Sequence, residues 1–152
     1  MSIAKQQKGF TIIEVVLVLA IAGLIFLIVF LALPDLERAR RNTQRKTDIG
    51  HIVSALETYE ANNGGAFPTT ANFQTFLNTY EPNETDPSTG TQYQYTNPGA
   101  TPADLATLTP GEVDYFIGDD CSGGQPAAAT ATDVAVVIAL EPTGTYQCQS
   151  NN

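Results

Sequence analysis

KGFTIIEVVLVLAIAGLIFLIVFLALP, residues 8–34, is the stretch that decides the fold of this chain. From Phe10 to Leu33 it contains 24 residues and one charged side chain, Glu14. A helix rises 1.5 Å per residue, so this segment is about 36 Å long and exceeds the roughly 30 Å hydrocarbon core of a bilayer. The stretch therefore predicts a membrane-spanning helix over residues 10–33. An ordinary secretory signal has a shorter apolar region, of about 7–15 residues, with its cleavage site behind it.

Glu14 is the residue of this stretch that needs an explanation. An acidic side chain at the centre of a membrane helix costs roughly 2.5–3.5 kcal/mol, and less near the interface. Ionisable residues inside a membrane segment are therefore candidates for function by default. A plain membrane anchor would leave both Glu14 and the Lys8-Gly9-Phe10 junction before it without a role.

The residues around Glu14 resemble the class III signal of type IV pilins and pseudopilins. A short polar leader, residues 1–9, ends in Gly9, and the chain continues as FTIIE into the apolar helix. The resemblance implies that a prepilin peptidase cuts between Gly9 and Phe10 and that the new Phe10 amine is N-methylated. It also implies that Glu14 of an incoming subunit compensates the Phe10 amine of a neighbour. Two charges that are costly alone in lipid become tolerable as a pair.

Two residues of the apolar helix are candidates for helix flexibility. Pro34 predicts a kink, because it removes a backbone hydrogen bond and clashes with the preceding turn. Gly23 is a small residue of the kind that lets membrane helices pack closely. The pilin resemblance implies more, because in that family the region between a mid-span glycine and a proline often loses helical structure in the filament. Pro34 lies a few residues later than the usual proline of the family.

Residues 34–63 predict an amphipathic continuation of the helix. Apolar side chains recur there at three- and four-residue steps, and Asn62-Asn63-Gly64-Gly65 is a stop signal. We expect this half of the helix to pack against a globular head formed by residues 64–152. The stripe consists of Ile49, Ile52, Val53, Leu56 and Tyr59.

A basic cluster, Arg38, Arg41 and Arg45, lies near one face of the amphipathic segment. We interpret it as a solvated face next to the membrane that meets lipid head groups. Salt bridges between filament subunits and the capture of DNA are the alternatives. The positive-inside rule alone would place the residues after this cluster in the cytoplasm. The pilin signal and the cysteine pair described next instead place the head outside.

The head is predicted to be a small antiparallel sheet of three to four strands, so that the fold class is α+β. Residues 133–140 form the most apolar strand candidate and are expected at the centre, followed by a turn and a hairpin partner at 145–149. Further strands are predicted at 91–96 and 112–117, and residues 118–132 are expected to be a mobile loop. In an exported domain the pair Cys121 and Cys148 is most simply a disulfide.

No catalytic constellation is visible in the sequence. There is no nucleophile–base arrangement, phosphate loop or Cys/His metal spacing, which argues against an enzyme. The single histidine, His51, is interpreted as a polar-face residue of the helix. Asp119, Asp120 and Asp133 are weak candidates for a calcium site, and no other cofactor is expected. Pseudopilins of type II secretion carry calcium in this region.

These observations favour a structural protein. The pilin resemblance implies a major-type pilin that enters the cytoplasmic membrane as a single-pass precursor and then joins an extracellular homopolymer. Its partners would be further copies of itself, the prepilin peptidase, the inner-membrane assembly machinery, and a host or other surface. Adhesion, motility and DNA uptake are the uses that the family suggests.

A secretion or competence pseudopilin is the alternative, because FPTT at 67–70 and the D-P…G-x-x-Y-x-Y pattern at 86–95 resemble the major pseudopilin. A membrane-anchored binding module that does not polymerise is the third hypothesis.

Overall fold

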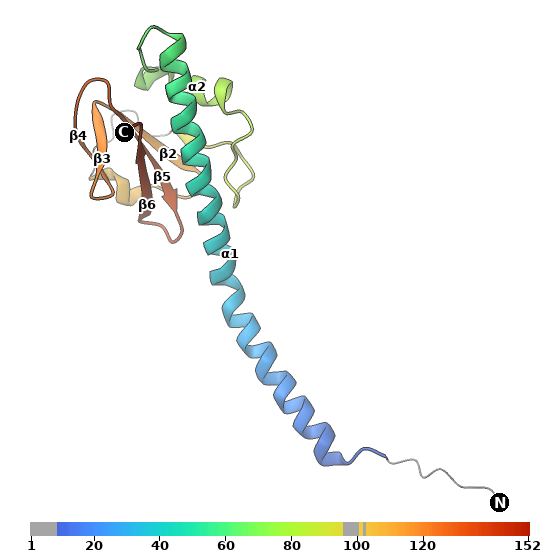
Figure 1. Cartoon of the computed structure of the whole chain (residues 1–152). Coiled ribbons are helices and arrows are strands. Elements are labelled where there is room, and N and C mark those ends of the chain that lie inside the picture. Colours follow the sequence, from blue (N-terminus) through green and yellow to red (C-terminus); the bar gives the residue numbers. More distant parts are fainter. Residues whose placement is uncertain (1–8, 96–100, 102) are drawn as a thin grey trace, which may run out of the picture. The chain divides into compact units, whose positions relative to one another are not determined.

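The computed structural model of the chain describes residues 9–95, 101 and 103–152 (Figure 1). The chain divides into two compact units, Met1–Glu37 and Arg38–Asn152. One helix, α1 (Ile12–Asn62), contributes to both units. The predicted membrane-spanning and amphipathic segments are therefore parts of the same helix, which ends at the predicted stop signal.

The second unit contains a four-stranded sheet and a short second helix, α2 (Phe73–Tyr80). The order of the strands in the sheet is β1-β2-β5-β6. Each of the four strands lies within or overlaps a predicted range, although β1 is shorter than predicted. Strand β5 has a partner on each side, as expected of the central strand. The strands are β1 (Gln94–Tyr95), β2 (Glu112–Ile117), β5 (Val134–Leu140) and β6 (Thr145–Ser150).

The sheet is not purely antiparallel. Strand β2 pairs with β5 and β5 with β6 in antiparallel fashion, whereas β1 pairs with β2 in parallel. A parallel pair requires a crossover connection between its two strands. Here the connection includes a 3₁₀ turn, η2 (Asp104–Thr107), so the chain enters β2 in the same direction as β1.

One face of the sheet is covered by α1 and α2. The apolar stripe predicted on α1 is buried there, with Ile49, Ile52 and Leu56 completely inaccessible to solvent. These side chains meet the inward-facing residues of α2, Phe73 and Phe76, and alternate residues of β2 and β5. The three- and four-residue spacing places the stripe on a single side of the helix, which explains why the head forms against it.

The other face of the sheet is covered as well. Leu105 and Leu108, in and beside η2, pack with Phe116 of β2 and Val137 of β5. Because both faces are covered, every residue of β5 is buried. This explains why its sequence, VAVVIAL, is a continuous apolar run rather than an alternating one.

The prediction of a mobile loop at residues 118–132 is wrong. Residues of this segment form a two-stranded sheet, β3 (Asp119–Ser122) and β4 (Gln125–Ala128). Gly123 and Gly124 form the two-residue turn, and both have positive φ angles, of 61° and 83°. Two central residues with positive φ are what a type I′ hairpin turn requires, so the Gly-Gly pair was a hairpin signal in the sequence.

A disulfide joins Cys121 of β3 to Cys148 of β6. It lies at the edge of the core formed around Leu105 and Val137. The bond therefore ties the two-stranded sheet to the last strand of the main sheet, rather than fastening a loop to it.

Asp114 of β2 is a buried carboxyl group on the same face as Val137, which lies opposite it in β5. Its exposed fraction is 1%, and among the described residues no donor forms a hydrogen bond with either carboxylate oxygen. Burial raises the pKa of Asp114 to about 6, with smaller contributions from the negative charges of Glu112 and Asp104. A folded-state pKa above the unfolded value means that stability is full at low pH and falls as the pH rises.

We expect Asp114→Asn to stabilise the head at pH 7 by roughly 1–3 kcal/mol, because it removes a buried charge without a partner. The gain should shrink as the pH falls from about 6 and should be smallest below about 4, where the wild-type carboxyl group is mostly protonated in both states. Chemical unfolding of the full chain in detergent, followed at several pH values, measures this difference. Glu57→Gln, at an exposed position of α1, serves as the control. A constant difference between Asp114→Asn and wild type across this pH range would contradict the prediction.

Candidate functional site

Gly9, Phe10 and Thr11 precede the first turn of α1. The side chain of Phe10 is 88% exposed, and apart from the neighbouring residues of the chain no atom lies within 4 Å of the position that a Cβ would take at Gly9. The peptide bond between Gly9 and Phe10 is thus sterically open in the described structure. A protease can reach such a bond without unfolding the helix behind it.

Thr11 and Glu14 form three reciprocal hydrogen bonds at the start of α1. The backbone N–H and the hydroxyl of Thr11 both donate to Glu14 Oε2, at 2.9 Å each. The backbone N–H of Glu14 donates in return to Thr11 Oγ1, at 3.4 Å. This is the capping box of a helix N-terminus, written in the sequence as T-x-x-E. Sequence reasoning gave Glu14 a role in assembly but missed this local role.

The apolar side chains of the first unit are exposed along the whole length of the segment. None of the residues in the most apolar 18-residue window is buried, and α1 is the one described helix long and apolar enough to cross a membrane. Burying such a surface is worth roughly 25 cal/mol per Å², so water is an unfavourable environment for it. The segment requires lipid or other apolar helices around it.

Residues 4–30 match the family model of the prokaryotic N-terminal methylation motif. The chain carries a class III prepilin signal. With its apolar helix, this signal fits a membrane-anchored precursor that is then assembled outside the cell. It supports a prepilin of the pilin or pseudopilin type, and it implies processing by prepilin peptidase. No curated protein and no solved structure matches the chain.

Gly23 and Pro34, the two candidates for flexibility behind the prepilin signal, both lie inside α1. The helix continues across Pro34. Apart from the neighbouring residues and backbone of α1, no atom lies within 4 Å of a Cβ built on Gly23. The space around Gly23 is therefore open in a single subunit. A change of conformation in a filament stays a prediction for both residues.

The interpretation of the basic cluster as a solvated face is wrong for Arg45 and Arg41. Arg45 is completely buried, and its guanidinium donates to Asp86 Oδ2 at 2.5 Å and to Glu141 Oε1 at 2.9 Å. Arg41 forms a two-pronged ion pair with Glu141, at 2.7 and 2.6 Å. Both arginines are thus held by carboxylates of the second unit, to which they belong. Arg38 remains on the exposed side of the helix.

The partners of these arginines come from distant segments. Asp86 lies in the loop after α2, and Glu141 follows β5 in the hairpin turn to β6. The hydrogen bond from Arg41 and the contact with Arg45 lower the pKa of Glu141 to about 2. Burial opposes ionisation of Asp86, but hydrogen bonds from Arg45 and Ser88 hold its pKa below the usual value. Both carboxylates are therefore charged at neutral pH, and the cluster fastens α1 to two loops of the head.

The carboxylates of the calcium candidates Asp119, Asp120 and Asp133 are not among the described ligand groups that lie within 4.8 Å of one another. Asp133 accepts hydrogen bonds from Thr130 and Asn152, while Asp120 accepts from the hydroxyl of Ser150 and the backbone of Cys121. Asp119 lies at the start of β3. Among the described residues, the ligand group that converges within 4.8 Å is a different set: Asp48, His51 and Glu84. A calcium site at residues 119, 120 and 133 stays an untested prediction.

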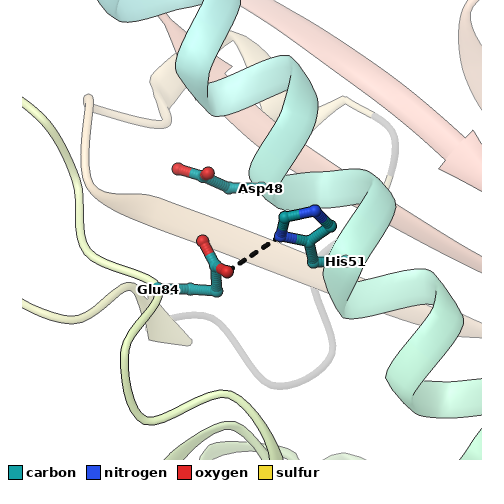
Figure 2. Close-up of side chains that lie close together, drawn as sticks. All are labelled: Asp48, His51 and Glu84. Carbon is teal, nitrogen blue, oxygen red and sulfur yellow. Dashed lines mark hydrogen bonds and ion pairs between the residues drawn. The ribbon is translucent and has the colours of Figure 1, made fainter.

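His51 is exposed on α1, as expected of a polar-face residue, but it has specific neighbours. Its Nδ1 atom lies 2.9 Å from Glu84 Oε1 (Figure 2). Asp48, one helical turn before His51, is buried and accepts a hydrogen bond of 2.7 Å from the hydroxyl of Tyr93. The sequence does indicate that Asp48 and His51 lie close together, because residues three positions apart share a helix face. Nothing in the sequence indicates that Glu84 joins them.

Proposed function

We propose that the chain is a structural subunit, a major-type pilin, of a type IV pilus. Prepilin peptidase removes residues 1–9, and the amine of Phe10 is methylated. The helix of residues 10–33 first holds the subunit in the cytoplasmic membrane and then forms the filament core. Residues 34–63 connect this core to the head, residues 64–152. The role is structural rather than enzymatic.

The observation that carries the proposal is the exposed apolar surface of the first unit behind a prepilin signal. In the precursor, the lipid tails of the bilayer cover these apolar side chains and keep them from water. In a filament, the apolar helices of neighbouring subunits take the place of the lipid. They can do so because each helix is apolar on every side. Such an exchange costs little free energy per helix, since lipid tails are as apolar as the side chains they leave.

Glu14, the single carboxylate of the apolar segment, determines how far along its neighbours an incoming subunit is placed. Glu14 Oε2 is engaged by Thr11, whereas no described residue donates a hydrogen bond to Oε1. The methylated amine of a neighbouring Phe10 is a cation that can pair with this carboxylate. The inner-membrane assembly machinery would then lift one subunit at a time into the filament. Adhesion, surface motility and DNA uptake are the uses proposed for the finished pilus.

Processing at Gly9 is the first test. We expect replacement of Gly9 by leucine to block cleavage, so that the precursor accumulates in the membrane with its leader attached. Gly23→Ala is the matched control, because it changes a glycine in the same segment that also has open space around it. Mass spectrometry of the N-terminus checks both variants. A mature species that begins at Phe10 in the Gly9 variant would contradict the cleavage site.

Electron microscopy of the cell surface tests the filament itself. The proposal predicts surface filaments that contain the subunit beginning at N-methyl-phenylalanine. A processed subunit that forms only short periplasmic filaments would instead support the pseudopilin alternative. A processed subunit that stays monomeric in the membrane would support the anchored binding module.

A further inference from the structure

Three metal-ligating side chains converge on one side of the head, at a position that the prepilin signal does not involve. Asp48 and His51 extend from neighbouring turns of α1, and Glu84 comes from the loop after α2 (Figure 2). One ligand atom of each lies within 4.8 Å of the other two. The three residues belong to the same unit, Arg38–Asn152.

The arrangement places two carboxylates beside each other. Asp48 is almost fully buried, and its Oδ2 atom accepts a hydrogen bond from the hydroxyl of Tyr93. Like charges at such a distance repel, and a cation between them removes the repulsion. A divalent ion would balance the two negative charges while the imidazole stays neutral.

We propose that Asp48, His51 and Glu84 bind a single zinc ion. Zinc accepts one imidazole nitrogen and carboxylate oxygens at about 2.0–2.2 Å, which places its ligand atoms roughly 3.3 Å from one another. The 2.9 Å between His51 Nδ1 and Glu84 Oε1 is close to this separation. The exposed side chain of His51 can open the small additional distance by rotating. The side chains of His51 and Glu84 are 56% and 20% exposed, so water can reach the remaining coordination positions.

The donor set favours zinc over calcium. Calcium takes six to eight oxygen ligands, whereas imidazole suits zinc and the other later transition metals. Tyr93 holds the carboxylate of Asp48 from the outside, through the hydrogen bond of its hydroxyl to Oδ2. Such outer partners orient a ligand and typically change metal affinity by about 10–100-fold. Bound zinc would connect α1 to the loop after α2 through three side chains, two from the helix and one from the loop.

The test is zinc titration of the full chain in detergent, without a histidine tag, followed by calorimetry and by thermal unfolding. We expect one equivalent of zinc to bind and to raise the melting temperature. His51→Gln and Glu84→Gln should each weaken binding by at least about tenfold, since each removes a ligand rather than an outer partner. Tyr93→Phe should weaken it by about tenfold. Glu57→Gln, at an exposed position on the same helix, should bind as wild type.

Cobalt substitution provides a second measurement that does not depend on stability. Visible absorption bands of bound Co²⁺ report its ligands, and they should change in His51→Gln. The circular dichroism spectrum of the metal-free variant should match that of the wild type, which shows that the variant is folded. Absence of stoichiometric zinc binding to the wild-type chain would overturn the proposal. So would zinc binding that His51→Gln and Glu84→Gln leave unchanged, or a preference for calcium over zinc.

Discussion

Glu14→Leu is expected to be cleaved and stable in the membrane, yet absent or nearly absent from filaments when it is the sole subunit. The variant makes the membrane segment more apolar, so insertion should not suffer. It removes the carboxylate that we expect to pair with the Phe10 amine of a neighbour. An uncompensated cation in an apolar filament core is strongly unfavourable, because there is no water to solvate it.

Glu14 has two roles that Glu14→Leu removes together, its charge and its part in the capping box, and further variants separate them. Glu14→Leu also removes the hydrogen bonds that Glu14 accepts from Thr11 at the start of α1. Glu14→Gln keeps a side chain that can complete a capping box but lacks the charge. Thr11→Val keeps the charge and removes the hydroxyl. We expect filaments from Thr11→Val and none from Glu14→Gln.

Filament yield from cells that express each variant alone, compared with the amount of mature subunit in the membrane, measures these effects. Normal yield from Glu14→Leu would overturn the role of Glu14 in assembly. Normal filaments from Glu14→Gln, with none from Glu14→Leu and Thr11→Val, would assign the effect to the helix cap instead of the charge.

Arg45→Met is expected to lower the free energy of unfolding of the head by about 3–5 kcal/mol. This is the usual cost of removing one partner of a buried ion pair while the other stays buried. Methionine occupies much of the volume of the arginine stem, so the loss is mainly electrostatic. The variant leaves Asp86 fully buried without its cation. It also removes the donor to Ser88 and one of the donors to Glu141.

Arg40→Met is the matched control, because Arg40 lies on the same helix and is exposed. Its effect should stay within about 0.5 kcal/mol. The chain has no tryptophan, so circular dichroism is the appropriate probe of unfolding in denaturant. The double variant Arg45→Met, Asp86→Asn should recover part of the loss, since it removes the uncompensated charge as well. A loss below about 1 kcal/mol for Arg45→Met would mean that the cluster contributes no more than a surface ion pair.

Local patterns in the sequence determined the elements of this chain. Twenty-four residues with a single charge predicted the apolar part of α1, and the three- and four-residue spacing from Ile49 to Leu56 predicted its packed part. The apolar run before Leu140 indicated the central strand, and the turn after it indicated the hairpin to β6. These predictions succeeded because helix and strand periods are properties of neighbouring residues. The prepilin signal, likewise, is a short contiguous segment.

The partners of polar side chains were decided only by the tertiary structure. Spacing placed Arg45 on a helix face, but its partners, the buried Asp86 and the partly buried Glu141, lie 41 and 96 residues away. The same holds for Glu84, which reaches His51 across 33 residues. Charge and spacing identify a side chain that needs a partner but carry no information about which distant loop supplies it. That choice follows from the packing of α1 against the sheet, which brings these loops to one side of the helix and converts a predicted solvated face into a buried ion-pair cluster.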